Sequence, residues 1–177
     1  MLYLLDASVL ITAHAQYYPV DRIPEYWEWL IHMAEQGTVK IPIEIYEEIK
    51  AGPVEKDLLY EWLNGEACKR CLVLSDVVPP ALVRRVITEG YAPDLNDEEV
   101  EQVGRDPFLI AHALAVRGRC VVTVENSQPK KQRANRKIPD VCKALGIECC
   151  DPFAFTRKLG FSTNWKVNRA NEGPNRR

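Results

Sequence analysis

Three acidic residues could carry chemistry in this sequence, and all three stand at the ends of apolar segments. Asp6 follows the apolar run "LYLL", and Asp106 opens "DPFLIAHALAVRG", which leads through "CVVTV" to Glu125. In an open parallel sheet the ligand crevice lies at the carboxyl ends of the strands, so Asp6 and Glu125 are expected at one edge. Carboxylates gathered there repel one another, and a divalent cation can hold them together. Mg²⁺ or Mn²⁺ in such a site suits phosphodiester hydrolysis.

A simpler role competes for two of these acids. Asp6 and Asp106 each precede a helix, and an aspartate at the N-cap contributes about 1 kcal/mol by accepting a bond from a free amide of the first turn. Pro107 suits the first helical position because its missing N–H costs nothing there. Glu125 is neither a good cap nor favoured at a strand end without a partner. Spacing alone leaves both interpretations open for the two aspartates.

The elements that must position these acids alternate along the chain, which predicts an α/β fold: a single three-layer domain with a central, mainly parallel sheet flanked by helices. Strands are expected in "LYLL", "VKIP", "CLVL", "CVVTV" and "IECC". Helices are expected after Asp6 and in "PEYWEWLIHMAEQ", "IEIYEEIKA", "EKDLLYEWLN", "PPALVRRVITE", "PFLIAHALAVR", "IPDVCKAL" and "DPFAFTRKL". The acidic segment "YAPDLNDEEVEQVGRD" is expected to be a surface loop.

Length and composition indicate one domain over residues 1–165, followed by a polar, disordered tail over 166–177. The chain has 177 residues, of which 46% are hydrophobic and 27% charged, with a net charge of −2. That charge does not exclude nucleic acid, because a local basic patch is enough. No apolar run approaches the roughly 20 residues of a membrane span, and the start lacks the features of a signal peptide. We therefore expect a cytoplasmic protein without a membrane partner.

Three of the quoted segments resemble the PIN-domain ribonucleases, of which the VapC-type toxins of toxin–antitoxin pairs are the largest group. "YLLDASVLI" is similar to the opening strand with the first acid, and "IPIEIYEEIKAG" to the helix with the second acid. "DPFLIAHALAVRGRCVVTVE" is similar to the segment with the third and fourth. The resemblance covers most of the chain. The order and spacing of the motifs together carry it, since each motif alone is weak.

Residue by residue, the resemblance implies an acidic quartet that acts as catalytic and metal-binding group, with two polar residues that position water or phosphate. The quartet is Asp6, Glu48, Asp106 and Glu125, and the polar pair is Ser8 and Thr123. Glu44 and Glu47 lie on the same predicted helix as Glu48, so the second acid is Glu44 or Glu48, and the family pattern favours Glu48.

The resemblance implies a ribonuclease that uses Mg²⁺ or Mn²⁺, cleaves RNA, is restrained by an antitoxin and forms a homodimer. The sequence departs from the common pattern in three ways. It is longer than a minimal toxin, it has Glu125 where aspartate is commoner, and its "KIPDVCKALGIECCDPF" resembles an uncharacterised branch of the superfamily. The longer Glu125 leaves one metal or two possible. A catalytically inactive PIN-like module that binds nucleic acid or protein is the alternative.

Five basic residues follow Glu125 and predict contact with the phosphates of a nucleic acid. They are Lys130, Lys131, Arg133, Arg136 and Lys137. A solvated loop without a partner is the alternative, because charged loops are commonly that.

Six cysteines are expected to stay reduced in a cytosolic protein of this size. The "CKRC" motif of Cys68 and Cys71 has metal-ligand spacing, and Cys142, Cys149 and Cys150 could complete a zinc site. The absence of a second C-x₂-C motif makes this zinc site the weaker hypothesis.

The histidines and tryptophans give no further catalytic signal. His14, His32 and His112 fall on three separate helices and form no Ser/His/Asp or Cys/His grouping. Trp27, Trp29 and Trp62 are expected in packing, either in the core or in a groove for the antitoxin or for dimerisation.

Overall fold

Five parallel strands form the central sheet of the computed structural model, which describes residues 1–52 and 58–167. The strands are β1 (Leu2–Leu5), β2 (Val39–Pro42), β3 (Val73–Leu74), β4 (Arg119–Val122) and β5 (Glu148–Cys150). Their order is β3-β2-β1-β4-β5, and every neighbouring pair is parallel. The predicted α/β class with a central parallel sheet flanked by helices is confirmed.

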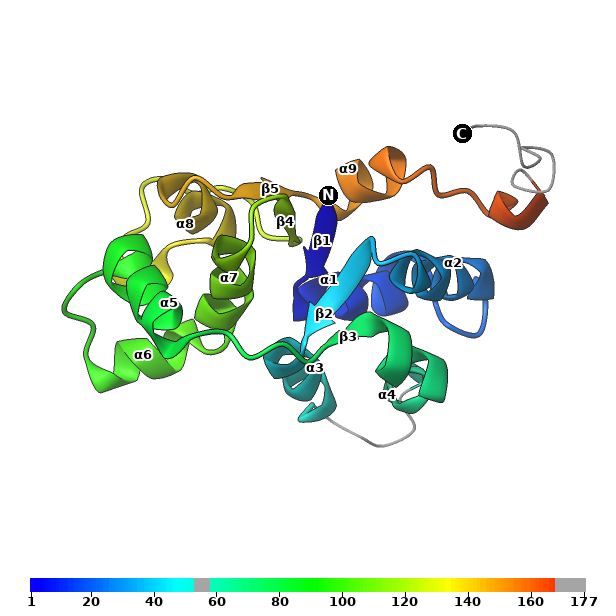
Figure 1. Cartoon of the computed structure of the whole chain (residues 1–177), viewed down its shortest axis with the longest axis horizontal. Helices are drawn as coiled ribbons and strands as arrows, with labels where there is room; N and C mark the ends of the chain where they lie inside the picture. Colours follow the sequence, from blue (N-terminus) through cyan, green and yellow to red (C-terminus); the bar gives the residue numbers. More distant parts are fainter. Residues whose placement is uncertain (53–57, 168–177) are drawn as a thin grey trace.

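Helices and helical turns connect the strands. They are α1 (Ala7–Thr12), the π-helical turn η1 (Ala13–Tyr17), α2 (Pro24–Glu35), α3 (Ile43–Lys50), α4 (Leu58–Asn64), the π-helical turn η2 (Cys68–Leu72), α5 (Pro80–Arg85), the π-helical turn η3 (Val86–Tyr91), α6 (Asp97–Val103), α7 (Asp106–Ala115), the 3₁₀ turn η4 (Arg133–Asn135), α8 (Ile138–Ala144) and α9 (Pro152–Lys158). Helices α5 to α8 gather on the left of Figure 1, and α2, α4 and α9 lie on the right.

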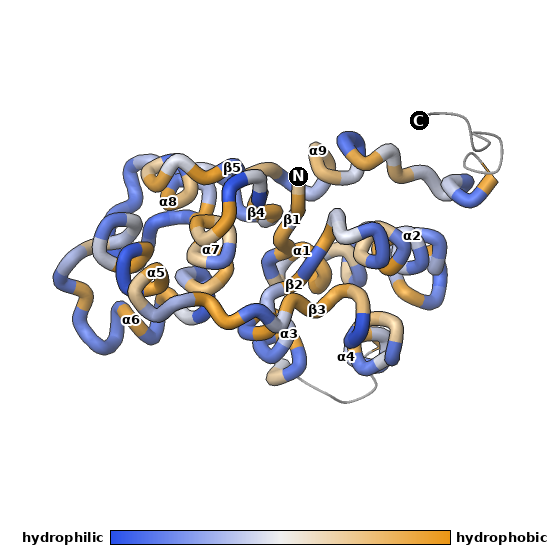
Figure 2. Tube along the Cα trace, viewed as in Figure 1, coloured by the Kyte–Doolittle hydropathy of each residue, from blue (hydrophilic) through white to orange (hydrophobic). Residues whose placement is uncertain are grey.

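The core lies around the two central strands. Leu4 and Leu5 of β1 and Val121 and Val122 of β4 are fully buried, as expected for strands covered on both faces. In Figure 2, β1 is orange, whereas the chain around α6 is largely blue and hydrophilic. Such continuous apolar runs explain why the short strands were readable from the sequence.

The sheet reverses its order at β1, whose partners are β2 on one side and β4 on the other. From β1 the chain moves outward to β2 and β3, then crosses back to β4 and continues to β5. Such a switch point opens a crevice at the carboxyl ends of the two strands between which the order reverses. Asp6 directly follows β1, and Thr123 directly follows β4. The fold therefore places both residues beside this crevice.

The acidic segment before Asp106 is not the loop predicted above, because it contains helix α6. Asn96 and Glu99 form a capping box in which each side chain accepts a bond from the backbone N–H of the other. This Asn-x-x-Glu spacing was the signal that the loop prediction missed. Three acids in the first turn, Asp97 to Glu99, favour the positive end of the helix dipole.

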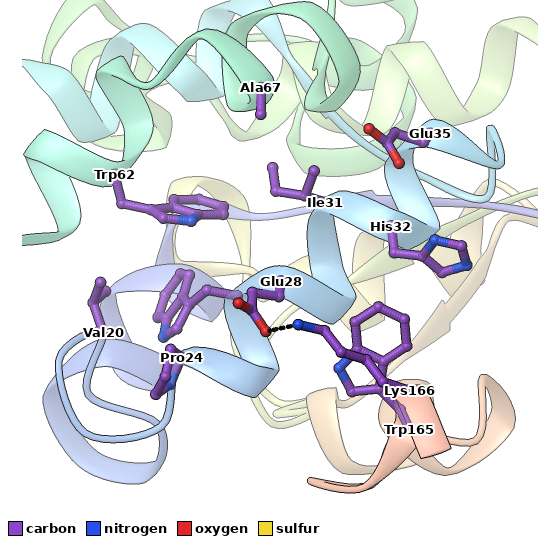
Figure 3. Close-up of a pocket in the computed structure, with 11 residues that line it drawn as sticks. Val20, Pro24, Glu28, Ile31, His32, Glu35, Trp62, Ala67, Trp165 and Lys166 are labelled. Atoms are coloured by element: carbon purple, nitrogen blue, oxygen red, sulfur yellow. Dashed lines mark ion pairs between the residues drawn. The ribbon is translucent and has the colours of Figure 1, made fainter. Parts of the chain in front are cut away.

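The segment after α9 packs against α2. The indole of Trp165 donates a hydrogen bond from Nε1 to the carbonyl oxygen of Glu25, at 3.0 Å. Lys166 pairs with Glu28, with Nζ and Oε2 2.7 Å apart (Figure 3). Lys166 and Val167 belong to a helical turn, so the predicted disordered tail does not begin at 166. The rest of that predicted tail, 168–177, lies outside the described residues.

Within residues 1–52 and 58–167, none of the helices combines the length and the apolar character that crossing a membrane requires.

Candidate acidic site

The first acid, Asp6, is held by two hydroxyl groups. Its side chain is 7% exposed, and the Thr123 hydroxyl donates a hydrogen bond to Asp6 Oδ2 at 2.8 Å. Ser8 donates a second bond to the same oxygen. Burial raises the pKa of Asp6, the bonds from Ser8 and Thr123 lower it, and the negative charge of Glu125 raises it. Because Thr123 follows β4, this contact joins the ends of the two central strands across the switch point.

The second acid is Glu48, and the structure separates it from Glu44. The Glu44 carboxylate lies 3.1 Å from Nε2 of His112, which is buried at 1% exposure. Glu48 is more exposed. Partial burial raises its pKa most, the charge of Asp6 raises it further, and the charge of Arg105 lowers it. Glu44 is therefore paired with His112, whereas Glu48, which the family pattern favours, is near enough to Asp6 for their charges to interact.

The third acid, Asp106, is partly buried, and its pKa is strongly raised. It is the first residue of α7 and forms no capping hydrogen bond, so the capping interpretation finds no support. No hydrogen bond or ion pair to its carboxylate exists within residues 1–52 and 58–167. Burial and the charges of Asp6, Glu125 and Glu48 raise its pKa to about 8, against a lowering by Lys137. Burial and three neighbouring negative charges thus act together on Asp106.

The fourth acid, Glu125, lies three residues beyond β4 and is tied to the start of α8. One carboxylate oxygen accepts a hydrogen bond from Lys137 Nζ at 2.6 Å, and the other accepts one from the backbone N–H of Ile138 at 2.8 Å. The bond to Glu125 raises the pKa of Lys137, so its ammonium stays charged. Glu125 therefore anchors a helix N-terminus and sets a lysine beside the acids.

Asp6, Glu48, Asp106 and Glu125, which we call the acidic cluster, repel one another but do not converge on one point. In the described part of the chain, no three His, Cys, Asp or Glu side chains lie close enough together to hold a metal ion. The donor set nevertheless fits Mg²⁺ or Mn²⁺, because it consists of carboxylate oxygens. Burial raises the pKa of Asp106 most, and the charges of Asp6, Glu125 and Glu48 raise it further; a bound cation would offset these three charges. Binding a cation would require side-chain movement, above all of Glu125 away from Lys137.

The five basic residues after Glu125 divide into two groups. Arg133 bonds to Glu99 through Nε and to Asp94 through Nη1, at 2.6 and 2.8 Å. Arg136 donates to the carbonyl oxygens of Gly90 and Asp140. With Lys137 bound to Glu125, three of the five hold the loop in place. Lys130 and Lys131 are exposed and remain the candidates for phosphate contact.

Two features of the site were missed by the sequence reasoning. Lys137 was assigned to nucleic acid, whereas it is the counter-ion of Glu125. Tyr91, at the end of η3, is 6% exposed, and its hydroxyl lacks a hydrogen-bond partner within the described residues. The nearby motif "EGYAPD" carries a turn signal only, so no pattern in the sequence marked Tyr91.

The tryptophans pack as expected, and one cavity of about 440 Å³ lies beside them. Trp27 and Trp29 are buried in the core, at 2% and 1% exposure. Figure 3 shows the cavity between α2, Trp62 of α4 and the C-terminal segment, with Trp165 stacked near His32. Glu28 and Lys166 close one side of it through their ion pair. This cavity lies outside the acidic cluster.

The cysteines are free thiols. Cys68 and Cys71 are buried in η2, apart from the other four, which lie on β4, α8 and β5. Cys120 and Cys150 have their sulfur atoms 3.7 Å apart on neighbouring strands.

Comparison with known proteins gives a family without an assigned activity. No curated protein matches the sequence. Residues 3–163 match the family described as "Domain of unknown function (DUF4411)". Since the match spans most of the chain, including all four acids of the cluster, this protein belongs to the DUF4411 family.

Proposed function

We propose that this protein is a metal-dependent ribonuclease that hydrolyses phosphodiester bonds in RNA. One observation carries the proposal: Asp106 lies partly buried among three other acids, with no hydrogen bond to its carboxylate from the described residues, beside the switch point of a parallel sheet. Ionisable groups with strongly shifted pKa values occur more often at functional sites than elsewhere in proteins. The resemblance to PIN-domain ribonucleases supports the same reaction.

Asp6, Glu48, Asp106 and Glu125 are the residues that would hold Mg²⁺ or Mn²⁺. When bound, the cation would supply an activated water and stabilise charge on the phosphate. The hydroxyl groups of Ser8 and Thr123 both donate to Oδ2 of Asp6, and these two bonds fix the orientation of the carboxylate. Their own role is therefore to position an acid, alongside the water or phosphate that the resemblance implies.

The basic residues would attract and hold the RNA backbone. Lys130 and Lys131 are exposed and can reach phosphates flanking the scissile one. Lys137 is held at Glu125, next to Asp106, where its ammonium could neutralise a phosphate once Glu125 turns to a cation. Arg133 and Arg136 fix the loop that carries these lysines.

Cleavage of a mixed-sequence single-stranded RNA tests the proposal. We expect products with Mn²⁺ or Mg²⁺, none with EDTA, and a loss of rate of roughly a hundredfold or more in Asp106→Asn. Asp97→Asn, on the exposed first turn of α6, is the matched control and should cleave like the wild type. Equal rates in wild type and Asp106→Asn, or no metal-dependent products at all, would remove the proposal.

The resemblance also supports the role of a cytoplasmic toxin that is a homodimer and is restrained by an antitoxin protein. Co-expression with the product of a neighbouring gene, followed by size-exclusion chromatography with light scattering, tests both partners. A monomer that gains no stable partner would contradict this role and leave the nuclease test independent.

A catalytically inactive binding module is the second candidate, and one observation favours it. Lys137 already neutralises Glu125, as an internal cation would in a site that has lost its metal. Calorimetry with Mn²⁺ separates the two: stoichiometric binding that Asp106→Asn abolishes supports the nuclease, and no binding supports the module.

A further inference from the structure

Two free cysteines meet between β4 and β5, outside the acidic cluster. Cys120 lies on β4 and Cys150 ends β5, and the Cys120 thiol donates a hydrogen bond to the Cys150 sulfur, with the two Sγ atoms 3.7 Å apart. Cys150 pairs in register with Val122, two residues after Cys120, so both cysteine side chains lie on the same face of the sheet. Strand pairing therefore holds the two thiols together.

The two thiols differ in their exposure. Cys120 is 1% exposed, whereas Cys150 is partly exposed. Cys150 lies on β5, an edge strand that has a neighbouring strand only on the β4 side. A molecule as small as hydrogen peroxide can meet a partly exposed thiol from solvent. Cys150 is thus the thiol that meets such a reagent first, with Cys120 as its buried neighbour.

The surroundings of Cys150 favour its thiolate, which is the reactive form. The hydrogen bond from Cys120 lowers the pKa of the Cys150 thiol most, burial raises it, and the positive charge of Lys158 in α9 lowers it, so that the net shift is downward. The same hydrogen bond, followed by burial, raises the pKa of Cys120, which therefore keeps its proton. An accessible thiol of lowered pKa beside a second thiol is the arrangement found in cysteines that respond to oxidants.

We infer that Cys120 and Cys150 form a redox-sensitive dithiol, which hydrogen peroxide converts to a disulfide. The Cys150 thiolate attacks one peroxide oxygen, the O–O bond breaks, and a Cys150 sulfenic acid forms as hydroxide leaves. The Cys120 thiol then attacks the Cys150 sulfur. The S–S bond forms, the S–O bond breaks, and water leaves with the Cys120 proton. The two thiols lose two electrons in total, and the peroxide is reduced to two molecules of water.

The dithiol adjoins the residues that support the acidic cluster. The carbonyl oxygen of Cys150 accepts a hydrogen bond from the Thr123 backbone N–H at 3.2 Å, and the Thr123 hydroxyl donates to Asp6. Closing the disulfide requires the two sulfur atoms to approach by about 1.7 Å, directly beside this bond. The inference concerns thiol chemistry alone, so it stands or falls independently of the proposed function.

Peroxide treatment of the native protein, followed by intact-mass spectrometry and peptide mapping without reductant, tests the inference. We expect the free thiols to fall from six to four, with a link between Cys120 and Cys150 that dithiothreitol reverses. Cys150→Ser should form no link, and Cys120→Ser should stop at a Cys150 sulfenic acid that dimedone traps. Cys149→Ser removes a partly exposed neighbour on the same strand, and as the matched control it should still form the link.

A measurement on the wild type alone keeps the test valid if a variant does not fold. With iodoacetamide at about pH 7, Cys150 in the native protein should be alkylated at least roughly threefold faster than Cys149. Equal or slower alkylation of Cys150 overturns the inference. So does a native wild type that keeps all six thiols in peroxide, or a disulfide that joins Cys142 to Cys149 instead.

Discussion

Two aspartates of this protein show how hydrogen bonds decide whether a buried carboxylate is stabilised in its charged form. Asp140 is 8% exposed, and it accepts bonds from the Ser127 hydroxyl at 2.6 Å and the Gln128 backbone at 2.7 Å. Burial raises its pKa. The two hydrogen bonds and the charges of Arg136 and Lys143 together lower the pKa by more than burial raises it, so the net shift is downward. Asp106 is partly buried beside other negative charges, and burial followed by these charges raises its pKa to about 8.

The contrast predicts opposite stability effects for the same substitution. At pH 9, where Asp106 is charged, Asp106→Asn should raise the free energy of unfolding by about 1 kcal/mol or more, because a pKa unit corresponds to about 1.4 kcal/mol. Asp140→Asn should lower it by about 1–2 kcal/mol, because it weakens two hydrogen bonds. Urea unfolding of the RNA-free protein measures both. An Asp106→Asn variant that is less stable than the wild type would make Asp106 a structural residue.

At the scale of elements, η3 packs closely against α8, whose first residue holds one acid of the site. The start of α8 holds Glu125 through the Ile138 N–H, and η3 carries Tyr91. Their separation is set by Gly90, since any larger residue would meet Val141 of α8. Gly90 is therefore required by packing, and no positive φ is involved.

Gly90→Ala should separate the two elements and lower the free energy of unfolding by about 1–3 kcal/mol, the usual cost of overpacking. Val141→Ala alone should destabilise as well, because it leaves a cavity. The double variant should be more stable than the sum of the two single effects, since the new methyl group fills the space of the old one. Denaturant unfolding of all four proteins tests this, and strict additivity would mean that the two residues do not meet.

At the scale of the whole molecule, the pKa shifts combine into one dependence of stability on pH. The folded-state pKa values of Asp6, Glu48 and Asp106 are raised, so the folded protein binds more protons than the unfolded chain above about pH 4, and stability falls as the pH rises towards 8. Glu99, bound by Arg133, has its pKa lowered to about 2, and Asp140 is also lowered. Their stabilisation is present above about pH 4 and is lost as the pH falls through the folded values.

The RNA-free protein should therefore be most stable in mildly acidic solution and lose stability between pH 6 and 8. Mn²⁺ should restore more stability at pH 8 than at pH 6, because a cation binds the deprotonated cluster. Asp106→Asn should flatten the loss. Thermal unfolding across pH 5 to 9, with and without Mn²⁺, measures these effects. A Tm that rises steadily to pH 8 without metal would contradict the assigned direction of the Asp106 shift.

The sheet could be predicted from the sequence because it depends on local patterns, and the same patterns led to the candidate acids. Apolar runs that end in an acid, such as "LYLLD", are visible without tertiary information. Helix α6 was missed although its Asn96–Glu99 capping box is also local. Tyr91 and the Lys137–Glu125 pair could not be predicted, because each depends on how segments far apart in the chain pack together. Packing of this kind leaves no period in the sequence.

The pairing of β1 with β4 bears on how the protein is made. Leu2 pairs with Arg119, and Asp6 bonds to Thr123, 117 residues later in the chain. During synthesis, which proceeds from the N-terminus, one edge of β1 has no strand to pair with until most of the chain has left the ribosome. Contacts so distant in sequence also slow folding. The acidic cluster consequently cannot assemble before β4 has emerged, and under the proposed function a shorter nascent chain could not cut the message from which it is being read.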